Sequence, residues 1–243
     1  QAYFHERNRL VAALIHSQYK RGGHFVAESM QGQVKHLLSS QYSVVELRLK
    51  ALEDVFTGPG HLQAGISSIV PRVRALRTGF DDAVVETDPD AFPMVYREKL
   101  PRKGEDLGYP KTIVGRIAMA AKGSIKQVLP VKAASRANPE ARVPWTEARW
   151  WMLSQFDSAI VSNSDGSGAS WYHRDPARFR DLLARSIVLH KRLYQEWDAL
   201  QADYRAHVSE VVGPEAWART FGIADAARSQ ERPDAASATK EPR

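Results

Sequence analysis

The 243-residue chain contains no cysteine. It therefore has no disulfide framework, no thiolate metal site and no cysteine nucleophile. No stretch approaches the roughly 18 consecutive apolar residues that a membrane-spanning helix needs. The chain also lacks a P-loop, a dinucleotide-binding glycine motif, a serine nucleophile elbow and a metal-ligand spacing among its histidines. These absences exclude several of the enzyme classes that a sequence alone can reveal.

What is present is typical of a globular protein, with 43% hydrophobic and 26% charged residues. The length suits one large domain or two small ones. No signal peptide is visible, because Arg7 and Arg9 interrupt any apolar core near the start. No capping residue precedes the first helical pattern, so we expect a C-terminal piece of a longer protein.

The basic residues are unevenly distributed. The whole chain has a net charge of +6, and the segment from Arg97 to Arg142, with eleven basic and four acidic residues, has +7. A local basic patch suggests phosphate, nucleic acid or an anionic membrane surface as a partner. The alternative is a solvated basic linker. We expect no nucleic-acid binding, because no recognition motif accompanies the charge.

Apolar spacing near 3.6 residues predicts a mainly α-helical fold. The expected helices of the first part are residues 3–20, 24–39, 42–56 and 61–76, the last interrupted near Pro71. Their short connections favour a helical bundle. A further helix is expected at 111–129, after the proline-punctuated stretch 83–110.

A small antiparallel hairpin or meander is expected near residues 149–173, where the period changes to two. Its predicted strands are 150–155, 159–163 and 169–173. A long helix should then begin at Asp175-Pro176 and end at Gly213-Pro214. Apolar residues from Phe179 to Val211 form a coiled-coil-like seam, which favours a helix partner inside the chain or in another subunit.

The first helix places Arg7 and Asn8 on its apolar face in a helical projection, with His5 and Glu6 outside it or at its edge. A buried Arg and a buried Asn are costly unless they are paired. They could bind an internal acidic or backbone partner. They could equally form the polar end of a ligand pocket, since a guanidinium suits phosphate or carboxylate.

The 111–129 helix combines a broad apolar side with a basic one. Lys111, Arg116, Lys122 and Lys126 lie on the basic side. This pattern predicts an interfacial helix on an anionic membrane. The alternative is a surface helix whose apolar side packs on the protein.

Ordered motifs along the chain resemble the polymerising galactofuranosyltransferases, which build the cell-wall galactan of mycolate-bearing bacteria. The matching segments are 1–5, 7–11, 50–56 with Gly58, Pro59 and His61, then 81–85, 143–144, 147–150, and Gly166, Gly168, Tyr172, Arg174 and Asp175. The first match resembles the segment directly after the catalytic domain of that family. The matches follow one another in order from residue 1 to about 220.

The resemblance implies a domain of an enzyme that transfers galactofuranose from UDP-galactofuranose to a lipid-linked growing galactan. The family's catalytic GT-A domain and its divalent metal, magnesium or manganese, are expected upstream. We therefore expect no catalytic residue, metal or cofactor in this chain. His5, Arg7 and Asn8 are the expected substrate-proximal residues, and the four basic residues of 111–129 are the expected membrane contacts.

The implied organisation is a helical bundle at 1–82, a linker at 83–110, a C-terminal helical region with a small sheet at 111–221 and a disordered tail at 222–243. The expected partners are the upstream GT-A domain, the lipid-linked galactan, an anionic membrane at the cytoplasmic face of the plasma membrane, and further copies of the chain. The rival interpretation is a non-enzymatic module for helical oligomerisation or membrane docking.

Overall fold

The computed structural model describes most of the chain. The described residues are 1–16, 22–62, 66–78, 84–85, 112–131, 139–145, 148–162 and 168–213. Within them the chain is mainly α-helical, with one small sheet followed by a long helix, which confirms the predicted fold class. None of the helices in these ranges has the length and apolar composition needed to cross a membrane.

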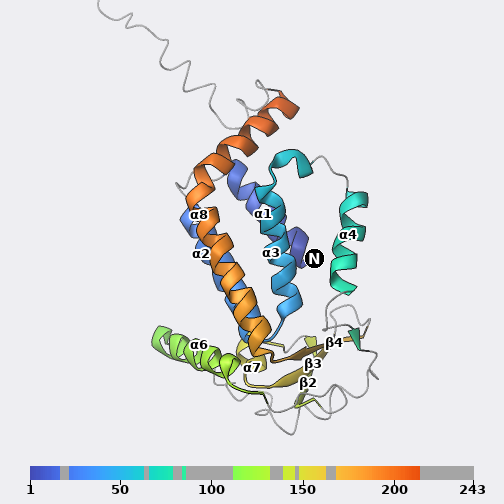
Figure 1. Cartoon of the computed structure of the whole chain (residues 1–243), viewed down its shortest axis with the longest axis vertical. Coiled ribbons are helices and arrows are strands. Elements are labelled where there is room, and N and C mark those ends of the chain that lie inside the picture. Colours follow the sequence, from blue (N-terminus) through green and yellow to red (C-terminus); the bar gives the residue numbers. More distant parts are fainter. Residues whose placement is uncertain are drawn as a thin grey trace, which may run out of the picture.

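Four helices form the bundle that stands upright in Figure 1. They are α1 (Ala2–His16), α2 (Gly23–Leu38), α3 (Tyr42–Phe56) and α8 (Pro176–Val212). The start of α1 and the ranges of α2 and α3 match the predicted helices to within one residue. After α3 come the 3₁₀ helix η2 (Pro59–Leu62) and α4 (Ile66–Thr78), which continues through Pro71.

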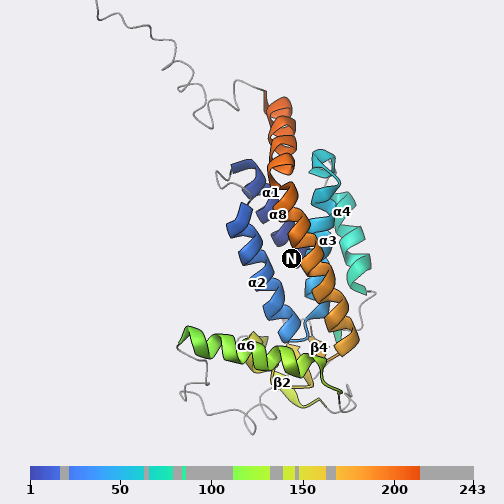
Figure 2. The same ribbon diagram turned by 60° about the vertical axis from the view of Figure 1, so that its left-hand side comes forward.

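The small sheet and α6 (Ile113–Val128) lie at the lower end of the bundle (Figures 1 and 2). The strand order is β1 (Val84–Val85), β4 (Ala169–His173), β3 (Ser158–Ser162) and β2 (Ala141–Val143). The predicted antiparallel hairpin is confirmed as β3 and β4, with Ile160 opposite Trp171. Strand β2 pairs with β3 in parallel.

The strand predicted at 150–155 is wrong, because Trp150–Leu153 forms the short helix α7. A brief apolar run does not distinguish a strand from a buried helical turn. Met152 and Leu153 are buried against β2 and β3, so the run still contributes to the core. Strand β2 was not among the predicted strands.

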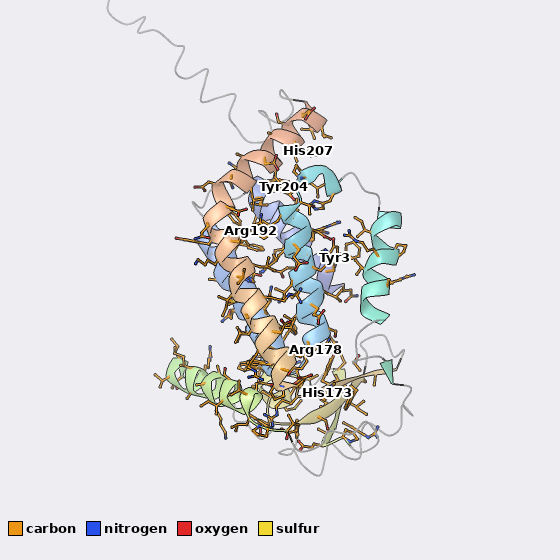
Figure 3. All side chains as sticks on the ribbon, in the orientation of Figure 1. Tyr3, His173, Arg178, Arg192, Tyr204 and His207 are labelled. Carbon is orange, nitrogen blue, oxygen red and sulfur yellow. The ribbon has the colours of Figure 1, made fainter. Side chains whose placement is uncertain are left out.

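Helix α8 begins as predicted, at a capping aspartate. The Asp175 carboxylate accepts the backbone N–H groups of Ala177 (2.9 Å) and Arg178 (3.0 Å), with Pro176 in the first turn. Figure 3 places Arg178 near the lower end of α8 and Tyr204 toward its upper end. Gly213, at φ 86°, ends the helix.

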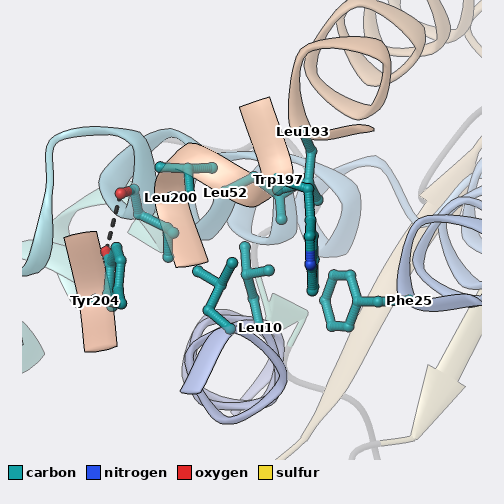
Figure 4. Close-up of a cluster of buried hydrophobic side chains, with 9 residues drawn as sticks. Leu10, Phe25, Leu52, Leu193, Trp197, Leu200 and Tyr204 are labelled. Carbon is teal, nitrogen blue, oxygen red and sulfur yellow. Dashed lines mark hydrogen bonds between the residues drawn. The ribbon is translucent and has the colours of Figure 1, made fainter. Parts of the chain in front are cut away.

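The apolar seam of α8 packs inside the chain, against α1, α2 and α3. Figure 4 shows Trp197 beside Phe25, with Leu10, Leu52 and Leu193 around them. The Tyr204 hydroxyl donates to the Val55 carbonyl at 2.9 Å, because its buried position requires an acceptor. The predicted regions 1–82 and 111–221 therefore share this core.

Several predictions fall outside the described residues. They are the 83–110 linker apart from β1, the tail at 222–243, the last residues of the first predicted helix, and Lys111.

Candidate functional site

Arg7 lies on the buried side of α1, as predicted, with a relative exposure of 9%. Its Nε and one terminal nitrogen donate to the Asn8 side-chain oxygen at 3.0 and 2.9 Å. Its guanidinium also lies over the rings of Phe4 and Tyr3, with centroids 5.3 and 5.9 Å away. These contacts hold the guanidinium plane in place without neutralising its charge.

Asn8 is exposed, which corrects its predicted burial. The buried arc of α1 is rotated from the predicted one, because Tyr3, Glu6, Leu10 and Leu14 point inward. His5 is exposed and precedes Asn8 by three residues, so both lie on one face of the helix. His5 and Asn8 thus lie on the outer side of α1, and Arg7, on the buried side, is linked to them through its hydrogen bonds to Asn8.

Glu6 is the buried charge that the sequence pattern placed at the edge of the apolar arc. Its side chain is fully buried, and it pairs with Arg48 at 3.2 Å and Arg9 at 3.4 Å. The Ser29 hydroxyl also donates to its carboxylate. Gly32 leaves room for this arrangement, because a Cβ there would stand 2.6 Å from Arg48. Glu6 therefore ties α1 to both α2 and α3.

The polar cluster continues to α8 through His190. Its Nε2 lies 2.9 Å from the Ser29 hydroxyl and its Nδ1 lies 2.7 Å from the Ser186 carbonyl. The Ser186 hydroxyl donates to Gln33 at 2.7 Å. Burial lowers the pKa of His190, so its imidazole is neutral near pH 7. A neutral ring can donate from Nδ1 to the Ser186 carbonyl.

A second buried carboxylate, Asp54, lies near the start of α1. It accepts the Tyr3 hydroxyl at 2.5 Å and pairs with Lys50 at 3.1 Å and with Arg72 of α4. Burial, followed by the hydrogen bond to Asp54, raises the pKa of Tyr3, which keeps its hydroxyl protonated as a donor. This cluster links α1, α3 and α4.

Helix α6 presents an apolar surface to solvent. Six large apolar residues in α6 or directly after it have relative exposures between 49% and 76%. We call this set the α6 surface, and its members are Ile113, Val114, Ile117, Ile125, Val128 and the adjoining Leu129. The opposite side contains Gly123 and Gln127, which are buried. Ala120 of the predicted apolar side packs against the bundle, whereas the large apolar residues of the α6 surface face outward.

The predicted membrane contacts are placed differently around α6. Arg116 and Lys122 are exposed, whereas Lys126 pairs with Asp157 at 3.2 Å and donates to the Gln155 carbonyl. Lys111 is not among the described residues. Lys122 lies next to the apolar stripe, whereas Lys126 is engaged in contacts within the chain.

The C-terminal half of α6 is firmly attached to the rest of the chain. The Gln127 amide donates to the Leu38 carbonyl at 2.9 Å and its oxygen accepts the Tyr42 hydroxyl at 3.0 Å. Arg174 donates to the carbonyls of Leu129 and Pro130 at 3.2 and 3.1 Å. The α6 surface is therefore displayed by a fixed helix.

No three His, Asp or Glu side chains in the described ranges lie close enough to hold a metal ion. The residues in these ranges do not fit the divalent metal of a GT-A enzyme.

Comparisons with known proteins agree with the resemblance found in the sequence. The family model for galactofuranosyltransferase-2, domain 3, matches residues 25–223. The chain is 31% identical over 217 residues to the galactofuranosyltransferase GlfT2 of Mycolicibacterium smegmatis, covering 89% of this chain and 33% of that protein. It is 29% identical over 220 residues to GlfT2 of Mycobacterium tuberculosis, covering 89% and 34%. The chain thus spans about a third of the length of these relatives.

Proposed function

We propose a function from one premise, that this chain belongs to the galactofuranosyltransferase-2 domain 3 family. It is a glycosyltransferase domain, and the proposal concerns the whole protein. That protein transfers galactofuranose from UDP-galactofuranose to a lipid-linked growing galactan. The observation that supports this most is the family match, which covers most of the bundle, the sheet and α8.

In this proposal the chain supports a catalytic GT-A domain and does not perform the chemistry itself. Its contribution near the substrate comes from Arg7, Asn8 and His5, with Asn8 and His5 on the outer side of α1 and the buried Arg7 hydrogen-bonded to Asn8. The magnesium or manganese ion of the reaction belongs to the GT-A domain.

The direct test is galactofuranose transfer from the UDP donor to a short galactofuranosyl acceptor. The 243-residue chain is assayed beside a longer protein that joins it to a GT-A domain of the same family. We expect activity only in the longer protein, and lower activity in its Arg7→Ala variant without unfolding. Activity in the short chain would refute the supporting role, and an inactive longer protein would refute the proposed function.

The second part of the proposal is membrane docking through the α6 surface. The surface is apolar and fixed, helix α6 contains no acidic residue, and Lys122 flanks its apolar stripe. An interfacial helix needs this combination of an apolar face and positive charge. A lipid-linked acceptor also requires an enzyme near the membrane, and we propose a peripheral location at the cytoplasmic face of the plasma membrane.

Docking is tested by co-sedimentation of the chain with vesicles containing anionic lipid. We expect Ile117→Asp to reduce binding strongly and Lys122→Glu to reduce it less, because apolar burial provides most of the attraction. Ile187→Asp is the matched control, since Ile187 is an exposed apolar residue of α8. Equal binding by the Ile117 and Ile187 variants would refute docking through α6.

The alternative is a non-enzymatic module whose α6 surface contacts another copy of the chain. The exposed apolar residues of α6 support this alternative, because such a surface is typical of a protein–protein contact. Sedimentation without lipid distinguishes it, because self-association through α6 would be lost in Ile117→Asp. A higher oligomer that persists in this variant would indicate an interface elsewhere.

A further inference from the structure

Arg7 is a buried cation without an acidic partner among the described residues. Its only hydrogen-bond acceptor there is the neutral amide oxygen of Asn8, and its other contacts are the rings of Phe4 and Tyr3. Removing a guanidinium from water is costly unless an opposite charge compensates. No anion among the described residues compensates the charge of Arg7.

The carboxylate next to Arg7 in the sequence is already occupied. Glu6 faces away from Arg7 around the helix and pairs with Arg9 and Arg48. Neither of its ion pairs includes Arg7, so the charge of Glu6 is compensated elsewhere.

The buried carboxylate near the start of α1 is occupied as well. Asp54 accepts the Tyr3 hydroxyl and pairs with Lys50 and Arg72. An anion from outside the described chain is what can complete the Arg7 environment.

We propose that Arg7 and Asn8 form a binding site for the phosphate oxygens of a diphosphate group. The Asn8 oxygen accepts from Arg7, so the amide nitrogen of Asn8 remains a donor on an exposed side chain. Arg7 retains a terminal nitrogen that receives no acceptor from the described residues. A planar guanidinium beside an amide donor matches the several acceptor oxygens of a diphosphate.

This site deepens the proposed function and rests on it for the identity of the ligand. The diphosphate could belong to the UDP-linked donor or to the lipid carrier of the acceptor. Both present the same oxygens to Arg7. His5, on the same face as Asn8, borders the site.

The test is titration of the intact 243-residue chain with inorganic pyrophosphate, followed by amide chemical shifts of α1. We expect saturable shifts centred on Arg7 and Asn8. Arg7→Gln should weaken binding by roughly tenfold or more, the cost of losing a charged hydrogen bond. Arg74→Gln is the matched control, because it removes the same charge from an exposed position on α4.

A second variant, Asn8→Asp, tests the same site if the Arg7→Gln chain does not fold. Its carboxylate would supply the missing anion within the chain, so we expect weaker pyrophosphate binding together with a higher melting temperature. Equal affinity in the wild-type, Arg7→Gln and Asn8→Asp chains would overturn the site, as would the absence of saturable binding to the wild-type chain.

Two further probes distinguish the sources of the diphosphate. Tighter binding of UDP than of pyrophosphate supports the donor. Arg7-dependent binding to vesicles containing an isoprenoid diphosphate, compared with the same vesicles without it, supports the acceptor. Failure of galactofuranose transfer with intact pyrophosphate binding would refute the proposed function and leave the site in place, and the reverse result would refute only the site.

Discussion

Buried charges on α1 face two different environments although they are adjacent in sequence. Glu6 points into the bundle, where Arg48, Arg9 and Ser29 surround it. Arg7 points toward Tyr3 and Phe4 and has only Asn8 as an acceptor among the described residues. The first charge is compensated within the fold, and the second is compensated by the anion that we propose.

Glu6→Gln should destabilise the chain by about 3 kcal/mol or more, because it leaves Arg48 buried without its counter-ion. Urea unfolding measures the change. Glu28→Gln is the matched control, since Glu28 also pairs with Arg9 at 3.4 Å but is half exposed. Its expected cost is at most about 1 kcal/mol, and equal costs for the two variants would contradict the importance of the buried pair.

His36 makes stability depend on pH. Burial, reinforced by the positive charge of Arg48, lowers its pKa from 6.5 to about 4. The unfolded chain therefore takes up a proton below pH 6.5 that the folded chain refuses until about pH 4. Stability present above pH 6.5 is lost as the pH falls, by about 2 kcal/mol at pH 5 from this group.

Urea unfolding at pH 7 and at pH 5 checks this dependence. His36→Gln should lose less stability between the two values than the wild-type chain. His24→Gln, which changes an exposed histidine, should keep the wild-type difference. An unchanged difference in His36→Gln would show that other groups control the acid sensitivity.

At the scale of elements, the helices whose signals come from residues close together in the sequence were predicted well. Helix α3 follows from apolar spacing, and α8 begins at Asp175 because a carboxylate cap and a proline coincide there. Strand β2 was missed and helix α7 was predicted as a strand, because segments of three or four residues take their conformation from what they pack against. The parallel pairing of β2 with β3 has no local sequence signal comparable to a helix cap or an apolar repeat.

The candidate site was predicted only in part for the same reason. The helical projection found that Arg7 is buried but misplaced Asn8 and Glu6. Their positions depend on which side of α1 meets α3 and α8. The Arg48 and Ser29 partners of Glu6 lie 42 and 23 positions away, a distance at which periodicity gives no information.

The entry into α2 depends on a glycine. Gly22 has φ 54°, and a Cβ there would stand 2.1 Å from the Trp197 ring. Gly22→Ala should therefore cost about 3 kcal/mol, combining a left-handed backbone with overpacking. Gly60→Ala, with nothing within 4 Å of its added carbon, should cost far less. Thermal unfolding compares the two, and similar melting temperatures would contradict the predicted clash.

At the scale of the molecule, a few polar side chains join the sheet, α6 and the bundle. Tyr42 donates to Gln127 of α6 and accepts the backbone N–H of Asp175 at 3.1 Å. Arg174 pairs with Asp157 at 2.9 Å and also binds the end of α6. These contacts connect three regions that are far apart in the sequence.

Arg174→Leu should loosen α6 without unfolding the bundle, because the core around Trp197 does not include this residue. Hydrogen exchange measures the effect, with faster exchange expected in the last turn of α6 and unchanged exchange in α3. The matched control is Arg180→Leu, since Arg180 is an exposed residue of α8 whose guanidinium donates to the Pro176 carbonyl of the same helix. Faster exchange throughout the chain would contradict a local role.

Helix α8 is uninterrupted, so it fixes how far apart the elements that pack against it lie along its axis. Ala120 of α6 packs against the cluster that contains Leu182, whereas Leu10 of α1 packs in the cluster that begins at Leu193. The 11 residues from Leu182 to Leu193 correspond to a rise of about 16 Å along this stretch of α8. A surface lying against α6 and a ligand held beside α1 are kept apart by this spacer, and a single molecule that touches both must be long enough to bridge it.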